Sequence, residues 1–130
     1  MYIKYELDYE DGVDPTDPLG RLVISDDSEN ILSLNETYID VWLVALLRAV
    51  LDIKESESLN VEVLEEPYSL YIEENDSNII IKYEKQSVKC DRNDMIIGIK
   101  NVSNDFIREL SKYEGFDKNE AIKLLKKLIN

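Results

Sequence analysis

Hydrophobic and polar residues alternate along several segments of the chain, and this pattern predicts β-strands. In residues 2–9, Ile3, Tyr5, Leu7 and Tyr9 fall on one face, with charged residues between them. The same pattern, or a short apolar run between turn residues, predicts further strands at 21–25, 31–34, 59–66, 69–74, 78–85 and 95–100. Segment 86–94 is expected to end a strand and turn. Gly98 in the last strand predicts a bulge or a close backbone approach.

The pattern changes between residues 38 and 52, where twelve of fifteen residues are apolar without glycine or proline. A helix that is apolar on nearly all sides belongs in the core. Asn35 or Thr37 is expected to cap its start. Trp42 is expected to pack there, and its indole N–H then needs a hydrogen-bond partner.

Two further helices are predicted near the C-terminus. Residues 104–115 place Phe106, Ile107 and Leu110 on one side, and Gly115 is predicted to end this helix in the left-handed conformation. Asp117 and Glu120 resemble a capping box at the start of the last helix.

These elements predict one α+β domain over residues 1–130. We expect an antiparallel sheet of about five to six strands with one buried central helix and two C-terminal helices. Residues 8–21 contain two prolines and two glycines, which predict a long hairpin loop, and 26–30 predict a second turn.

The chain has a net charge of -13, which narrows its possible partners. Binding to nucleic acid or to an anionic membrane requires clustered lysine and arginine, so neither is expected as a direct partner. A basic protein, a cation or a requirement for solubility remain. The longest apolar run is residues 41–47, too short for a membrane span. Met1 precedes a charged segment, so no signal peptide is expected. With Cys90 alone no internal disulfide can form, which fits the cytoplasm.

The chain lacks histidine, which excludes most common catalytic sites. Serine or cysteine nucleophiles activated by histidine and the zinc helix motif are not possible. One cysteine cannot form a thiolate zinc site, and the four glycines are too far apart for a nucleotide-binding loop. We therefore expect no enzyme activity, metal or cofactor. A pair of carboxylates remains possible, but among 28 some pair always lies close together.

Residues 8–20 contain enough carboxylates to raise the question of calcium binding. If Gly12 is the sixth residue of an EF-hand loop, only Asp11 among the three preceding ligand positions is acidic. Three interpretations remain open, namely a solvated loop, a partner-facing loop and weak cation binding.

Acidic residues form two clusters, in the loops of the first 30 residues and around the middle strands. Such a surface increases the rate of encounter with a basic partner, and tyrosine is frequent at interfaces. Tyr68, Tyr71 and Tyr83 lie within the second cluster, which also includes Glu74 and Asp76. The predicted partner-binding residues are Glu10, Asp11, Asp14, Asp17, Asp26, Asp27, Glu29, Glu65, Glu66, Tyr68, Tyr71 and Glu73.

In size, acidity and its predicted α+β plan, the chain resembles the bacterial immunity proteins of polymorphic and contact-dependent toxin systems. The resemblance implies tight binding to one cognate toxin, a basic and nuclease-like one, by occlusion of its active site or substrate channel. The alternative is a structural or protein-interaction domain, such as a homo-oligomer or a phage-type accessory factor. The sequence leaves the oligomeric state and the binding face open.

Overall fold

The computed structural model describes all residues 1–130 and contains seven strands and three α-helices. The strands are β1 (Tyr2–Leu7), β2 (Leu19–Ser25), β3 (Ile31–Tyr38), β4 (Ser58–Glu62), β5 (Ser69–Asn75), β6 (Asn78–Tyr83) and β7 (Gln86–Asp91). The helices are α1 (Ile39–Asp52), α2 (Arg92–Leu110) and α3 (Glu120–Ile129), with a 3-10 turn η1 (Phe116–Lys118) before α3. The predicted α+β class is confirmed.

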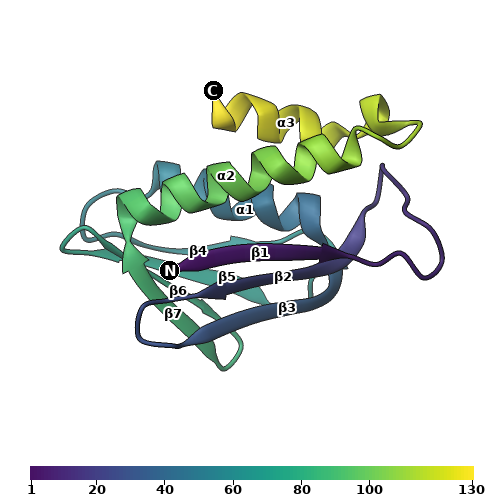
Figure 1. Cartoon of the computed structure of the whole chain (residues 1–130). Coiled ribbons are helices and arrows are strands. Elements are labelled where there is room, and N and C mark those ends of the chain that lie inside the picture. Colours follow the sequence, from purple (N-terminus) through teal and green to yellow (C-terminus); the bar gives the residue numbers. More distant parts are fainter.

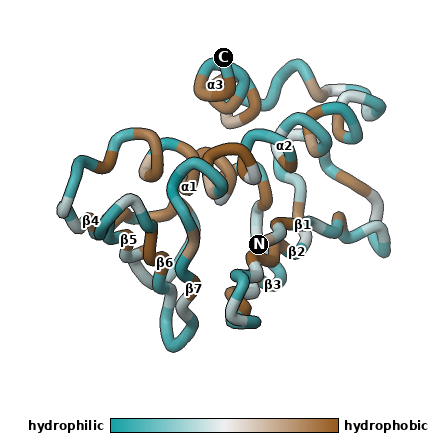
Figure 2. Tube along the Cα trace, turned by 60° about the vertical axis from the view of Figure 1, so that its left-hand side comes forward, coloured by the Kyte–Doolittle hydropathy of each residue, from teal (hydrophilic) through white to brown (hydrophobic).

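The strands form two antiparallel sheets rather than the single sheet of five to six strands that the sequence predicted. The first sheet has the order β1-β2-β3 and the second has the order β4-β5-β6-β7. The two sheets lie side by side with the helices on one side of both (Figures 1 and 2). All strand neighbours in each sheet are consecutive in the chain, so every connection within a sheet is a hairpin.

Side chains join the two sheets where β3 meets β7. The backbone N–H of Ser33 donates to Oε1 of Gln86 at 2.7 Å, and Nε2 of Gln86 donates to the carbonyl oxygen of Ser33 at 3.1 Å. The Gln86 amide thus takes the place of a peptide group in a neighbouring strand. Because this contact covers the inner edges of both sheets, the outer edges are β1 and β4.

The core lies between the sheets and the helices. Eight residues of α1 are buried, and α1 packs against both α2 and α3 (Figure 2). Trp42 is fully buried and packs edge-to-face on Tyr83, with ring centroids 5.0 Å apart. Its indole N–H donates to Thr37 Oγ1 at 2.8 Å, so the predicted need for a partner is met. Thr37 is used in this way and does not cap α1, and the helix begins at Ile39 after the N-cap residue Tyr38, which makes no side-chain cap.

The predicted strand at residues 95–100 is wrong, because these residues belong to α2. Met95, Ile99, Val102 and Phe106 are buried at helical spacing, and the side chain of Asp91 caps the helix by accepting from the N–H of Asp94. Strand β7 occupies the segment that was expected to turn.

Gly98 lies on the side of α2 that faces the start of β1. A Cβ at this position would meet the side chain of Met1 at 3.0 Å and that of Ile3 at 3.3 Å. The expected close approach is therefore made by a helix against a strand, without a bulge.

The two C-terminal helix boundaries also differ from the prediction. Helix α2 ends at Leu110, and Gly115, with φ of 94°, precedes η1 instead of ending α2. The cap of α3 is Asn119, whose side chain accepts from the N–H of Ile122 at 2.9 Å, so Asp117 forms no capping box.

Candidate partner-binding surface

The predicted first acidic cluster is divided between two ends of the first sheet. In the β1–β2 register Tyr2 pairs with Ser25 and Leu7 pairs with Gly20. Residues 8–18 therefore lie beyond one end of these strands and residues 26–30 beyond the other, as Figure 1 shows. Strands of six or seven residues separate the ends by about 20 Å.

Loop 8–18 exposes its carboxylates while the backbone of its second half is held in place. Nδ2 of Asn119 donates to the carbonyl oxygen of Pro15 at 2.9 Å, and the N–H of Ile39 donates to that of Pro18 at 3.1 Å. Within the loop, the hydroxyl of Thr16 donates to Asp14 at 2.7 Å and lowers the pKa of that carboxyl. The four predicted residues of the loop, Glu10, Asp11, Asp14 and Asp17, are exposed and form no ion pair.

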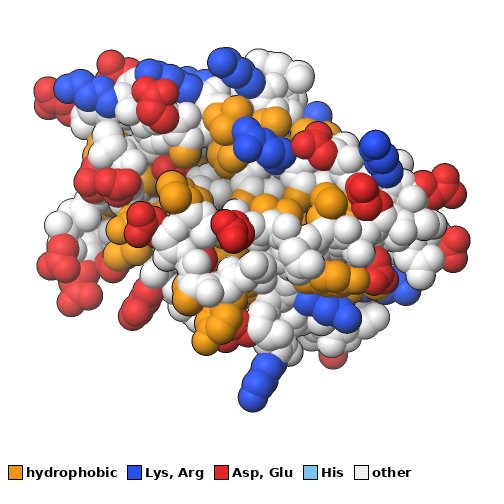
Figure 3. All heavy atoms as spheres, turned by 180° about the vertical axis from the view of Figure 1, so that it is seen from behind, with side chains coloured by type: hydrophobic (Ala, Val, Ile, Leu, Met, Phe, Trp, Pro, Cys, Tyr) orange, Lys and Arg blue, Asp and Glu red, His pale blue; other side chains and the backbone are white.

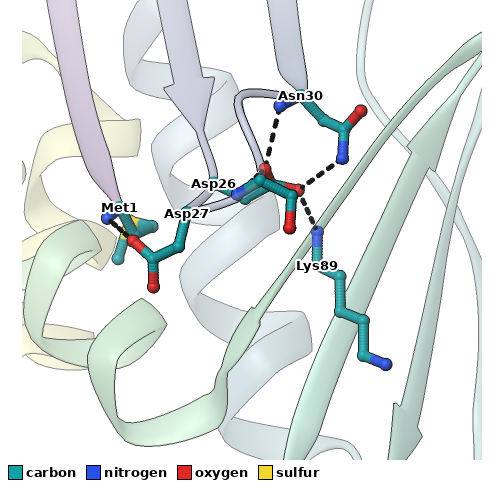
Figure 4. Close-up of polar contacts among 6 residues, drawn as sticks. Met1, Asp26, Asp27, Asn30 and Lys89 are labelled. Carbon is teal, nitrogen blue, oxygen red and sulfur yellow. Dashed lines mark hydrogen bonds and ion pairs between the residues drawn. The ribbon is translucent and has the colours of Figure 1, made fainter.

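The turn at residues 26–30 uses one of its three predicted carboxylates inside the fold. Asp26 is only 6% exposed, and its Oδ1 accepts from the backbone N–H groups of Ser28 and Asn30, both at 2.9 Å. Its Oδ2 accepts from Asn30 Nδ2 at 3.2 Å and from the N–H of Lys89 at 3.0 Å. Figure 4 shows this carboxylate between the β2–β3 turn and β7. Asp26 therefore holds the turn against the second sheet.

The other two carboxylates of this turn face outward. Asp27 pairs with the N-terminal ammonium group of Met1 (Figure 4), and Glu29 is exposed with φ of 66°.

Burial raises the pKa of the Asp26 carboxyl, and the N–H donors around it more than offset this effect. The donors are the backbone of Lys89, the backbone and side chain of Asn30, and the backbone of Ser28. The resulting pKa lies below the ordinary value, so Asp26 is charged at neutral pH although its residue is buried.

The connection between β4 and β5, residues 63–68, places Glu66 against the core aromatic residues. Glu66 Oε1 accepts from the hydroxyl of Thr37 and, at 3.1 Å, from Trp42 Nε1. Its Oε2 accepts from the Tyr83 hydroxyl at 3.4 Å. Burial, followed by the charge of Glu66, raises the pKa of Tyr83 to about 12. All three donors are neutral, so the negative charge of Glu66 has no cationic partner.

Aromatic rings connect this carboxylate to the surface. Tyr68 is 55% exposed and packs edge-to-face on Tyr83, with ring centroids 6.1 Å apart, and Tyr83 packs on Trp42. Leu64, in the same connection, is 71% exposed. The connection thus presents apolar surface beside its carboxylates.

Four segments that are distant in sequence meet at this end of the molecule. One surface hollow is lined by residues of the β1–β2 hairpin together with Asn35 and Glu36, and a second is lined by Asn35, Glu66 and Glu84 among others. We name residues 8–18, 35–38, 63–68 and 84–85 the acidic end. It contains nine carboxylates and one basic residue: Asp8, Glu10, Asp11, Asp14, Asp17, Glu36, Glu65, Glu66, Glu84 and Lys85.

The structure keeps part of the predicted site at this end. Glu10, Asp11, Asp14 and Asp17 lie in the loop that continues from Asp8 in the first hollow, and Glu66 lines the second hollow, with Glu65 and Tyr68 in the same connection. Asp26, Asp27 and Glu29 lie at the opposite end of the first sheet. Sequence reasoning missed Glu36, Glu84 and Leu64. Glu36 and Glu84 have φ of 49° and 55°, and each is isolated in the sequence from other acidic residues, so no local pattern marked them.

The remaining predicted residues lie on the second sheet, away from this end. Tyr71 and Glu73 are half-buried on β5, where the Tyr71 hydroxyl donates to Glu73 at 2.7 Å. Glu74 is buried and accepts from the N–H of Ser56 at 3.0 Å, which gives it a structural role. Asp76 lies in the turn to β6.

A second polar cluster joins β1 to α2. The Tyr5 hydroxyl donates to Glu109 at 2.5 Å and to Asp105 at 3.0 Å, and Tyr9 also donates to Glu109. These contacts lower the pKa of Glu109, while burial and the two carboxylates raise that of Tyr5. These contacts attach the β1 edge to α2, and Tyr5, Tyr9, Asp105 and Glu109 line an open surface hollow between the two elements.

The single cysteine, Cys90, is buried. Burial raises the pKa of the Cys90 thiol to about 11. No group of three or more aspartate, glutamate or cysteine residues is arranged to hold a metal ion. None of the helices combines the length and apolar composition that crossing a membrane requires.

Comparison with protein families, with curated proteins and with solved structures finds no match for this chain.

Proposed function

We propose that this protein is a non-catalytic acidic binding protein. In this proposal it is an immunity protein of the cytoplasm that neutralises a cognate basic, nuclease-like toxin. Its carboxylates occupy the cationic groove that the toxin uses for phosphate groups, and this blocks the active site or the substrate channel.

The acidic end is the observation that carries this proposal. Nine carboxylates gathered beside one lysine repel each other, and a few tenths of a kcal/mol per close exposed pair is a cost that binding to a basic surface would offset. The hydrogen bonds to Pro15 and Pro18 hold the second half of loop 8–18 and so keep Asp14 and Asp17 in place before binding, which lowers the entropic cost of association.

Affinity also requires a centre from which water is excluded, and the β4–β5 connection offers one. Leu64 and Tyr68 are exposed apolar and aromatic side chains next to Glu65 and Glu66. Tyrosine anchors surrounded by charged residues are typical of energetically dominant interface positions. The carboxylates would then steer the encounter, and Tyr68 with Leu64 would slow dissociation.

The test begins with a pull-down from the source cell and identification of the protein that co-purifies. A toxin partner should be encoded next to this protein, and co-expression should rescue cells from its toxic domain. Association is then measured by stopped flow at several salt concentrations. We expect the triple variant Asp11→Asn, Asp14→Asn, Asp17→Asn to associate at least fivefold more slowly and with a shallower salt dependence.

A matched variant separates this effect from the loss of net charge alone. This control variant also loses three negative charges, but at the other end of the molecule, through Glu29→Gln, Asp76→Asn and Asp94→Asn. All three residues are exposed. This control should change the association rate and its salt dependence much less. Equal effects of the two triple variants would mean that the acidic end is only solvated surface.

The alternative function is a structural or protein-interaction domain without a toxin partner, such as a homo-oligomer or a phage-type accessory factor. One observation favours it, an apolar groove of about 360 Å³ between α1, α3 and β4. Self-association on a sizing column, together with no neighbouring toxin gene, would support this alternative.

A further inference from the structure

The outer edge of β4 is the unprotected edge of the two sheets. Strand β4 pairs only with β5, so the peptide groups on its other side have no partner strand. Its sequence, SLNVE, contains no lysine or proline, the residues that commonly block such edges. The outer edge of β1 carries Lys4 and is attached to α2 through Tyr5 and Tyr9. Edge protection is thus present on β1 and missing on β4.

An apolar groove runs beside the open edge. Its walls are formed by Val44 and Ala45 of α1, Leu59 and Val61 of β4, and Leu124 of α3, and all five side chains are only partly covered. Figure 3 shows the molecule from behind, with hydrophobic side chains exposed in several patches across the face and charged side chains between them. A strand added to β4 would direct every second side chain into this groove.

The charge around the edge indicates what the other side chains of such a strand should be. Residues 52–66 contain six carboxylates and one lysine, a net charge of -5: Asp52, Lys54, Glu55, Glu57, Glu62, Glu65 and Glu66. By strand alternation Ser58 and Asn60 point away from the side of Leu59 and Val61, while Glu62 lines the end of the groove. Glu73 of β5 is paired with Ser58. The outward side chains of an added strand would meet these carboxylates.

We propose that an extended segment of a partner protein, in which apolar and basic residues alternate, adds to β4 as a fifth strand of the second sheet. Its apolar side chains fill the groove, and its lysine or arginine side chains face Glu62 and Glu73. Main-chain hydrogen bonds supply affinity and the groove supplies specificity. A second copy of this chain fits poorly, because it would bring two segments of charge -5 together. The inference rests on the proposed function only in that the partner is a basic protein.

The test uses two capped octapeptides of identical composition and the isotope-labelled full chain. One peptide alternates valine and lysine, and the other has four valines followed by four lysines. We expect the alternating peptide to bind at least tenfold more tightly and to slow amide hydrogen exchange within Ser58–Glu62. Equal affinity of the two peptides, or chemical-shift changes confined to residues 8–18, would overturn the proposal, because binding would then depend on charge alone.

Two variants test whether the alternating peptide binds in the groove. Ala45→Phe fills the groove and should lower the affinity for the alternating peptide at least tenfold. Ile97→Ala removes an exposed side chain of α2 outside the groove and should leave this affinity unchanged. Unchanged fluorescence of Trp42 shows that each variant is folded. Undiminished binding by folded Ala45→Phe, or dimers of the free protein on a sizing column, would also overturn the proposal. If the peptides fail while a basic partner still binds through the acidic end, the groove inference is wrong and the proposed function stands.

Discussion

Replacement of Asp26 by asparagine tests whether one carboxylate connects the two sheets. The substitution keeps the size of the side chain and one oxygen. That oxygen can still accept from the backbone N–H groups of Ser28 and Asn30 within the turn. The other oxygen becomes an NH2 group, which faces the donors Asn30 Nδ2 and Lys89 N–H. The turn is preserved while its bond to β7 is lost.

The expected cost follows from the bonds that are lost. A hydrogen bond to a charged group contributes about 1.5–3 kcal/mol, and an N–H left without an acceptor costs about 1–3 kcal/mol. Asn30 is exposed, so water can replace one of the two lost bonds. We therefore expect Asp26→Asn to lower the free energy of unfolding by about 2–4 kcal/mol.

Urea unfolding followed by the fluorescence of Trp42, the single tryptophan, measures this difference. Asp27→Asn is the control, since this neighbour is exposed and pairs only with the N-terminus, and its effect should be much smaller. Exchange of the Lys89 amide hydrogen should accelerate in Asp26→Asn alone. A loss below about 1 kcal/mol, or unchanged Lys89 exchange, would refute the role assigned to the carboxylate.

The same carboxylate predicts a pH dependence. Because its pKa is lower in the folded protein than its ordinary value of 3.8, its contribution is present above pH 4 and is lost as the pH falls through the folded value. The difference in stability between the wild type and Asp26→Asn should therefore narrow below about pH 4. A difference that stays constant down to pH 2 would contradict the assignment.

Three further predictions concern the C-terminal helices and a turn. Asn119→Ala removes the cap of α3 and a donor to the buried Asp40, so urea unfolding should show a loss of about 2–4 kcal/mol, whereas exposed Asn101→Ala should be nearly neutral. Burial raises the pKa of Asp40, so the wild type should lose stability relative to Asp40→Asn as the pH rises from about 4, measured by the same unfolding assay. Ser77 has φ of 67°, a conformation that glycine adopts without strain, so Ser77→Gly should increase the free energy of unfolding by about 1 kcal/mol and raise the calorimetric Tm by a few degrees. Ser87→Gly, within β7, should lower the Tm.

The strand and helix pattern was predictable wherever a single rule governed a segment. Strands β1, β5 and β6 alternate or form apolar runs, and α1 is apolar on nearly all sides. The first half of α2 was not predictable in this way, because MIIGIK is rich in β-branched residues and contains a glycine. Tertiary packing overrides these preferences, since Met95 and Ile99 continue the buried stripe of Val102 and Phe106.

The division into two sheets was not predictable, because the contact that joins them is made by individual side chains. Gln86 and Ser33 lie 53 positions apart, and a glutamine in a turn-rich segment carries no sign that it will bond to a distant strand. The same limit applies to the site. Asp26 and Asp27 are adjacent and chemically identical, yet one is buried with four donors and the other is exposed.

The number of carboxylates with a structural role shows how much of the negative charge the fold itself requires. Seven accept hydrogen bonds from residues at least 17 positions away, and an eighth, Asp91, caps α2: Asp26, Asp27, Asp40, Glu66, Glu74, Asp91, Asp105 and Glu109. Of the 28 carboxylates, 20 then remain against 15 basic residues. Only three ion pairs join lysine or arginine to a carboxylate, and all three lie on the surface, where such pairs contribute little. Folding therefore does not require the excess, and several of the remaining carboxylates collect in the four segments of the acidic end. Repulsion within such a group opposes folding, and an even distribution of the same charges would supply solubility at lower cost. The proposed attraction to a basic surface would offset this repulsion, which is why the salt dependence of association at the acidic end tests the proposal.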